Sequence, residues 1–249
     1  MMPVLELREH IATITLSRPE VANKLLPEDL AVLISHVEAV NRNDDVRVLM
    51  LRSVGKYFCS GYDISEVKNS QTPGSSFGEM VDAFEQCRAV TVAVVHGGVY
   101  GGATDLALAC DFRVGSTSAE MFMPAARLGL HFYQGGLERY VTRLGLDTAK
   151  RLFLTCERLS AQEMRACGFL THLAEPGSLD GVVAGLTDTL RSMAPLPLFG
   201  MKKHLNLIAR GQHDPEAIAR EVHRTVQSED LEEGGTAWRE KRKPVFTGK

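Results

Sequence analysis

Apolar residues in the first half of the chain change their spacing in a way that predicts alternating strands and helices. The segment VLELREHIATITL holds two β-type runs separated by charged residues, which predicts a hairpin that ends before Pro19. Residues 27–43 carry apolar side chains at helical spacing, whereas VRVLMLRS is almost continuously apolar, as in a strand covered on both faces. Helix, strand, helix and strand are then predicted in turn for residues 77–88, 90–95, 103–111 and 112–116. This alternation predicts an α/β fold with parallel strand pairing.

The following residues add two helices and a last strand. Residues 146–155 and 160–168 have helical spacing, and the second segment begins with a capping box from Ser160 to Glu163. Residues 169–175 then predict the final strand. The strands and helices of the core are therefore expected to continue well past the middle of the chain.

From about residue 178 onwards the pattern is almost wholly helical. It has a break at APLPL and a new start at Asp214, which can cap a helix that has proline in its first position. We therefore expect two parts, a core over residues 1–192 and a helical region over residues 193–249.

Composition and charge narrow the class of protein. With 249 residues, of which 44% are hydrophobic, the chain can bury a sizeable core. A net charge of -3 gives no overall attraction to nucleic acid or to an anionic membrane, so neither is an expected partner. Five cysteines without CxxC spacing predict neither a disulfide framework nor a metal site and favour a reducing compartment. Since the sequence also shows no apolar leader and no long apolar run, we expect a soluble, cytoplasmic protein.

The segment HGGVYGGATDLALACD joins a predicted strand to a predicted helix and carries two glycine pairs. It contains neither G-x-G-x-x-G nor the G-K-S/T of a P-loop, so it does not predict a nucleotide phosphate site. One interpretation is a tight turn in which glycines supply positive φ and close packing. The other is an oxyanion hole, formed by the first N–H groups of a helix that starts near Gly102 and by an N–H of the CSGYD loop. In that case Asp105 points its carboxylate towards the same pocket.

Five stretches, in this order and spacing, carry a resemblance to a known family. They are LSRPEVANKL at 16–25, GKYFCSGYDISE at 55–66, VAVVHGGVYGGATDLALACDFRV at 92–114, AEMFMPAARLGLHFYQGG at 119–136 and LFLTCERLSAQEMRACGFL at 152–170. The ending EGGTAWREKRKPVF at 233–246 also belongs to the resemblance. On these motifs the chain resembles the crotonase, or enoyl-CoA hydratase/isomerase, superfamily over nearly its whole length.

The resemblance implies a spiral of ββα units over residues 1–192 and a helical region over 193–249 that mediates assembly into a homotrimer, commonly stacked as a homohexamer. It implies an acyl-CoA thioester as substrate, with no further cofactor and no metal. The thioester oxygen would be held by the backbone N–H groups of Tyr62 and Gly102, which suits reactions that pass through an enolate. One branch of the family binds RNA, but the helix at 27–43 is acidic rather than lysine-rich, so nucleic acid is not expected.

Hydratases of the family use two glutamates as acid/base groups, and this sequence differs from them at both positions. Asp105 stands where hydratases of the family place one glutamate, and it remains the expected acid/base. Ala125 stands where the second glutamate follows a proline, and an alanine side chain cannot move a proton. The machinery that activates water is therefore incomplete, and efficient hydration of a simple enoyl-CoA is not expected.

Other residues are candidates to complete the site. Tyr133 stands where two other branches of the family place an aspartate, and it could supply a proton donor or serve as a pocket wall. His131 could supply an imidazole or a structural hydrogen bond. Lys56 and Lys241 are candidates to hold the CoA phosphates, Lys241 from a neighbouring subunit, or else are ordinary surface residues.

Three functions follow from this set. The first is an enoyl-CoA hydratase/isomerase-type lyase or isomerase of fatty acid metabolism that stabilises an enolate, with Asp105 as acid/base. The second is isomerisation, hydrolysis or decarboxylation of a less common acyl-CoA by Asp105 together with Tyr133. The third, motivated by Ala125, is a catalytically weak acyl-CoA-binding or assembly subunit.

Overall fold

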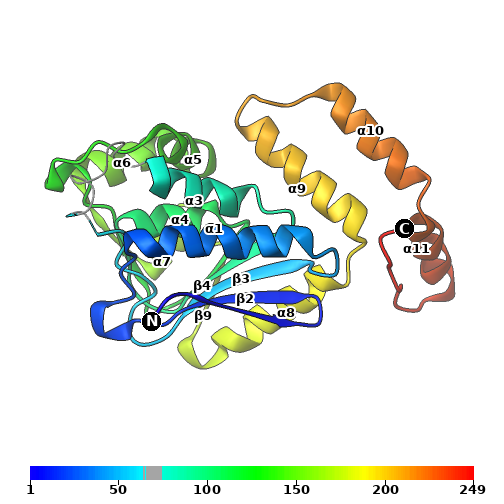
Figure 1. Cartoon of the computed structure of the whole chain (residues 1–249), viewed down its shortest axis with the longest axis horizontal. Coiled ribbons are helices and arrows are strands. Elements are labelled where there is room, and N and C mark those ends of the chain that lie inside the picture. The colour runs from blue at the N-terminus through cyan, green and yellow to red at the C-terminus, as the bar shows by residue number, and fades with distance from the viewer. Residues whose placement is uncertain (64, 66–74) are drawn as a thin grey trace.

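The computed structural model describes residues 1–63, 65 and 75–249, and in these residues a twisted sheet carries helices on both faces (Figure 1). The strands of this sheet, in spatial order, are β1 (Val4–Arg8), β2 (Ile11–Leu16), β3 (Val48–Ser53), β4 (Val90–Val95), β6 (Phe112–Ser116) and β9 (His172–Ala174). The hairpin partner β1 pairs antiparallel with β2, and every later pairing in this sheet is parallel. The predicted α/β fold with parallel pairing is confirmed.

Strand side chains alternate between two apolar layers. Leu49 and Leu51 of β3 join the large cluster beneath α1 (Pro27–Arg42), α3 (Ser75–Glu85) and α4 (Gly102–Ala109). Val48 of β3 faces the other way, into the cluster that α8 (Leu179–Arg191) covers. Figure 1 shows this arrangement, with α1, α3 and α4 on one side of the sheet and α8 on the other. The continuous apolar runs in the sequence follow from this double coverage.

Several short elements were not predicted. A second sheet is formed by β5 (Val99–Tyr100), β7 (Glu120–Phe122) and β8 (Arg158–Ser160), which are too short to show a period-2 pattern. The helix α5 (Gln134–Leu144) was also missed, because its sequence opens with glycines, which disfavour helix. α6 (Leu146–Thr155) and α7 (Ala161–Ala166) match the prediction, including the capping box between Ser160 and Glu163.

The last part of the chain forms the helices α9 (Pro195–Ala209), α10 (Pro215–Val226) and α11 (Glu229–Glu240). The predicted break at APLPL is misplaced by a few residues. The chain leaves helix between Arg191 and Pro195, and Pro195 already lies in the first turn of α9, where a proline removes no helical hydrogen bond. Helix α9 is fixed to the core by Lys202, whose ammonium lies 2.7 Å from Asp111 and 2.6 Å from the carbonyl oxygen of Ala89. Helices α10 and α11 extend away from the sheet (Figure 1).

Within the described residues, no helix combines the length and the apolar character that crossing a membrane would require.

Candidate active site

Two glycine-bearing loops meet at the start of α4. A side chain on Gly61 would place its Cβ 2.8 Å from the carbonyl oxygen of Tyr100 and 3.0 Å from the nitrogen of Gly102. Gly61 also has φ +94°, and its carbonyl oxygen accepts a hydrogen bond of 2.9 Å from the N–H of Leu25. Only glycine fits this approach, which brings the backbone just before Tyr62 against the first residue of the helix.

Gly102 is the first residue of α4 and is covered by an aromatic ring. A Cβ at Gly102 would lie 2.6 Å from Cζ of Phe77 in α3. The Phe77 ring lies 5.6 Å from that of Tyr62 and 6.1 Å from that of Tyr133, measured between centroids. The three rings form an apolar wall that runs from the N-terminus of α4 to Tyr133, the predicted proton donor.

Asp105 lies in the first turn of α4, and its side chain is fully buried. Its Oδ1 accepts a hydrogen bond of 3.0 Å from Nε of Arg139, and its Oδ2 accepts one of 3.3 Å from Nη2 of the same guanidinium. Oδ2 also accepts a hydrogen bond from the hydroxyl of Tyr133. Gly136 in α5 permits this approach, because a Cβ there would lie 3.1 Å from Oδ2. Both carboxylate oxygens are therefore held by donors from one helix and its cap.

Tyr133 is half-buried and caps the start of α5. Burial raises the pKa of its phenol well above its usual value, and the negative charge of Asp105 and the hydrogen bond to it raise it further. The phenol therefore keeps its proton at neutral pH and donates a hydrogen bond to the carboxylate. The structure brings Asp105 and Tyr133, both predicted as site residues, into direct contact.

Arg139 was not identified from the sequence, although its side chain is fully buried between the carboxylates of three residues. Besides Asp105, it binds Glu85 through Nη1 at 2.6 Å and Asp82 through Nη2 at 3.0 Å. Burial lowers the pKa of Arg139, but the charges of Asp105 and Glu85 outweigh this effect and raise it above its usual value. The guanidinium is thus a permanent cation in the core.

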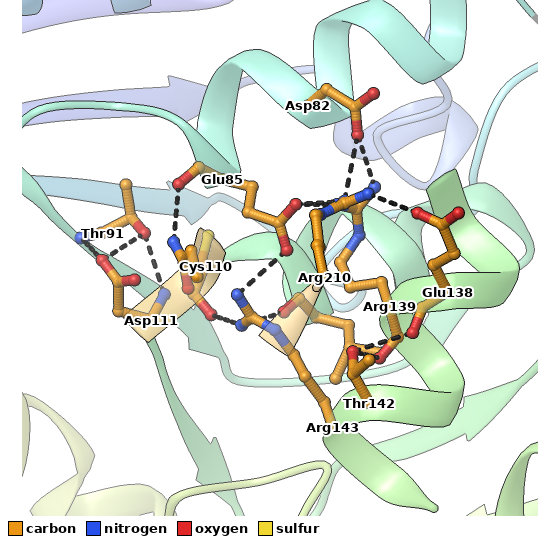
Figure 2. A network of polar contacts seen from close by, with 12 residues as sticks. Asp82, Glu85, Thr91, Cys110, Asp111, Glu138, Arg139, Thr142, Arg143 and Arg210 are labelled. Carbon is orange, nitrogen blue, oxygen red and sulfur yellow. Dashed lines mark hydrogen bonds and ion pairs between the residues drawn. The ribbon is translucent and has the colours of Figure 1, made fainter. Parts of the chain in front are cut away.

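The ion pairs continue from Arg139 to the end of α9 (Figure 2). Glu85 also binds Arg143 at 3.2 Å and Arg210, and Arg210 binds Glu138 at 2.8 Å. Buried charges are stable only when paired in this way, so the cluster joins α3, α4, α5 and Arg210, the C-cap residue of α9, into one unit. We refer to Asp82, Glu85, Asp105, Glu138, Arg139, Arg143 and Arg210 as the charged cluster.

The remaining predicted site residues lie apart from this contact. Ala125 is buried just before the 3₁₀ helix η2 (Ala126–Leu128), and its carbonyl oxygen accepts hydrogen bonds from the N–H groups of Leu128 and Leu130. Its side chain therefore adds apolar surface and no proton carrier. His131 is exposed, and its Nδ1 lies 2.7 Å from the carbonyl oxygen of Phe132, which is a local contact.

Both predicted phosphate-binding lysines are exposed. The ammonium of Lys56 lies 5.2 Å from the centroid of the Tyr57 ring. Lys241 caps α11 with φ +55°, and Figure 1 places α11 far from α4 in the same chain. Among the described residues, no group of three or more histidine, cysteine or acidic side chains is arranged to hold a metal ion.

The whole chain is similar to proteins of one family. The family model described as "Enoyl-CoA hydratase/isomerase" matches residues 6–249. The chain is 31% identical to an enoyl-CoA isomerase/hydratase of Mycosarcoma maydis, over 95% of this chain and 92% of that protein. It is 30% identical to a putative enoyl-CoA hydratase/isomerase of Bacillus subtilis, over 96% of this chain and 95% of the relative. A crystal structure of enoyl-CoA hydratase from Bacillus anthracis superposes with a TM-score of 0.91 at 26% identity, over 100% of both chains.

Proposed function

Because the chain belongs to the enoyl-CoA hydratase/isomerase family, we propose that it acts on an acyl-CoA thioester and stabilises an enolate of that thioester. The backbone N–H groups of Tyr62 and Gly102 are the proposed oxyanion donors. The close approach of Gly61 to Gly102 supports this assignment, since it leaves no side chain between the two loops. The positive end of the α4 dipole favours a negative oxygen at the same place.

Our choice among the reactions of the family rests on one observation, the hydrogen bond from Tyr133 to Asp105. It supports a mechanism in which these two residues, without a second glutamate, move a proton to or from the acyl chain. Because Ala125 offers no group to activate water, we propose isomerisation or a related reaction of a less common acyl-CoA over hydration. Hydrolysis and decarboxylation proceed through the same negative thioester oxygen and fall within this proposal.

A second candidate function is a catalytically weak acyl-CoA-binding subunit. Its support is that both oxygens of Asp105 are held by Arg139 and Tyr133, which leaves the carboxylate without an exposed atom. The two candidates differ in turnover and not in binding.

Assembly into a homotrimer or homohexamer is part of the proposal. Helices α9, α10 and α11 expose large apolar side chains, which mark surfaces that associate. They include Met201, Leu205, Ile208, Val222, Val226, Leu231 and Trp238. In such an assembly Lys241 could reach the CoA of a neighbouring subunit, and Lys56 that of its own. Sedimentation equilibrium gives the subunit number, and a monomer at micromolar concentration would contradict this part of the proposal.

The reaction is tested with a panel of acyl-CoA esters analysed by mass spectrometry. We expect wild-type protein to convert at least one ester and Asp105→Asn to lose that conversion by about 100-fold or more. Crotonyl-CoA hydration at the rate of an ordinary hydratase would contradict the role given to Ala125. Binding of esters without any product from the panel would favour the second candidate.

A further inference from the structure

Tyr133 and Asp105 differ in how far their side chains can be reached from the protein surface. Asp105 has no exposed side-chain surface, whereas Tyr133 is half-buried and packs beside Phe77 at the glycine loop. A bound acyl chain can therefore meet the phenol and not the carboxylate. Since the phenol O–H donates its hydrogen bond to Asp105, its oxygen can accept a proton from the ligand through a lone pair that Arg139 does not use.

We infer that Tyr133 is the group that exchanges a proton with the acyl chain, that Asp105 acts only through Tyr133, and that Arg139 is a positioning residue for Asp105. This inference rests on the proposed function, because it assigns separate roles within the same site. It differs from direct proton exchange by Asp105, which the sequence alone suggests.

The proton relay balances without any further reactant. A proton leaves carbon next to the thioester and bonds to the oxygen of Tyr133, while the phenol proton moves to Oδ2 of Asp105. The electron pair of the broken C–H bond moves into the thioester, which becomes an enolate. The negative charge thus passes from Asp105 to the thioester oxygen, where the N–H groups of Tyr62 and Gly102 stabilise it. The reverse sequence returns a proton to carbon and restores the carboxylate.

Arg139 fixes the far end of this relay. Its Nε and Nη2 hold the two oxygens of Asp105 in a fork, and the same guanidinium is itself held by Glu85 and Asp82. The carboxylate therefore has one rotamer, with Oδ2 aimed at the phenol. A lysine keeps the positive charge but has no planar fork, so it cannot fix both oxygens at once.

Deuterium exchange into butanoyl-CoA in D₂O measures enolate formation without knowledge of the natural substrate. Mass spectrometry follows the gain of mass at the carbon next to the thioester. We expect wild-type protein to catalyse exchange and Tyr133→Phe to lower kcat by about 100-fold or more, with KM for butanoyl-CoA within about twofold of wild type.

Tyr140→Phe is the matched control, because Tyr140 lies in the same helix and its buried hydroxyl contacts Thr104. We expect it to exchange within about threefold of wild type, as a hydroxyl outside the relay should. If Tyr133→Phe exchanges as fast as Tyr140→Phe while Asp105→Asn is inactive, the relay is wrong and the proposed function stands. If wild-type protein binds butanoyl-CoA but exchanges nothing at any pH, the proposed function itself fails.

Two substitutions at Arg139 test the positioning role. Arg139→Lys should lower kcat by about 100-fold with little change in KM, because Asp105 is no longer held in one orientation. Arg139→Gln should lower kcat at least as far, because it removes both the planar fork and the positive charge beside Asp105. Should Arg139→Gln fail to fold, the kcat of the lysine variant decides the matter. Wild-type kcat in Arg139→Lys would overturn the positioning role, since lost stability alone lowers the melting temperature without changing kcat of the folded enzyme.

Discussion

Around Asp105 charged side chains are buried and paired, whereas helices α10 and α11 expose large apolar side chains. Arg139 has no exposed side-chain surface, but Trp238 in α11 is 86% exposed. A buried charge is costly unless partners surround it, so the site is built from groups that all depend on one another. An exposed tryptophan costs little in folding and gains free energy only when another surface covers it. The charges around Asp105 are therefore paired within one chain, whereas the C-terminal helices expose the apolar surface on which the proposed assembly depends.

The two regions also differ in what their glycines do. In the site, Gly61 and Gly102 touch atoms of neighbouring elements so closely that no side chain fits. In α11, a Cβ on Gly235 would meet no atom within 4 Å. The same substitution should therefore have opposite effects on stability in the two regions.

From this difference between the glycines we expect the largest effect in the variant Gly102→Ala. The new methyl group would lie 2.6 Å from Cζ of Phe77, so either the ring or the start of α4 must shift. We expect loss of about 1–3 kcal/mol of unfolding free energy from overpacking. We also expect a fall of about 100-fold or more in deuterium exchange, because the proposed oxyanion donors are displaced. Urea unfolding and deuterium exchange measure the two effects.

Gly235→Ala is the matched control for this prediction. It should raise the unfolding free energy by up to about 1 kcal/mol, since alanine favours helix, and leave exchange unchanged. Wild-type exchange in Gly102→Ala would show that the close approach of the two loops is not needed for the reaction.

The second prediction concerns Arg210, which joins the two regions at the end of α9. The substitution Arg210→Gln removes the guanidinium and so leaves Glu85 and Glu138 with less positive charge beside them. We expect a decrease of about 2–3 kcal/mol in unfolding free energy, measured by urea unfolding, because Glu85 is buried and the Arg210 side chain is only 17% exposed.

Arg220→Gln provides the comparison within α10. The Arg220 side chain is 68% exposed and pairs with Asp214 at 3.6 Å, so its loss should change stability by no more than about 0.5 kcal/mol. Equal losses in the two variants would mean that the charged cluster contributes no more than surface pairs do.

The sequence predicted the elements whose apolar period is long, and it named part of the candidate site. The hairpin, the parallel strands and the capped helices follow from local patterns, because spacing and capping residues act within one segment. The glycine loop and Asp105 were identified from the order of motifs. Tyr133 was identified as a candidate because other branches of the family place an aspartate at that position. Its hydrogen bond to Asp105 depends on tertiary structure and could not be read from the sequence.

Arg139 could not be identified as a site residue from the sequence. A signal for its helix did exist, since Leu137, Tyr140 and Leu144 have helical spacing, but two glycines open the segment and obscured it. An arginine in a helix is ordinarily exposed. Arg139 can be buried only because three acidic residues of α3 and α4 pair with it, namely Asp82, Glu85 and Asp105. These residues lie far from Arg139 in the sequence, so only the folded structure brings them together.

The smallest expected effects come from one partly exposed ion pair in each region. Lys24 lies 2.5 Å from Asp63, and its hydrogen bond, with those from Ser65, lowers the pKa of that carboxyl to about 2 from 3.8. In α11, hydrogen bonds from Arg242 lower the pKa of Glu233 to about 2 from 4.5. A carboxyl whose pKa is lowered by folding stabilises the protein above its unfolded pKa, and this contribution is lost as pH falls towards the folded pKa.

Asp63→Asn and Glu233→Gln should therefore lower stability at neutral pH slightly and flatten its decline in acid. The differences from wild type should disappear between pH 3.8 and about 2 for Asp63 and between pH 4.5 and about 2 for Glu233. Thermal unfolding across this range measures both. Arg242 holds Glu233 through two nitrogens, at 2.6 and 2.7 Å, whereas Lys24 is a single mobile charge, so added salt should weaken the Asp63 effect more. Differences that persist at pH 2 would show that the two variants act through packing and not through charge.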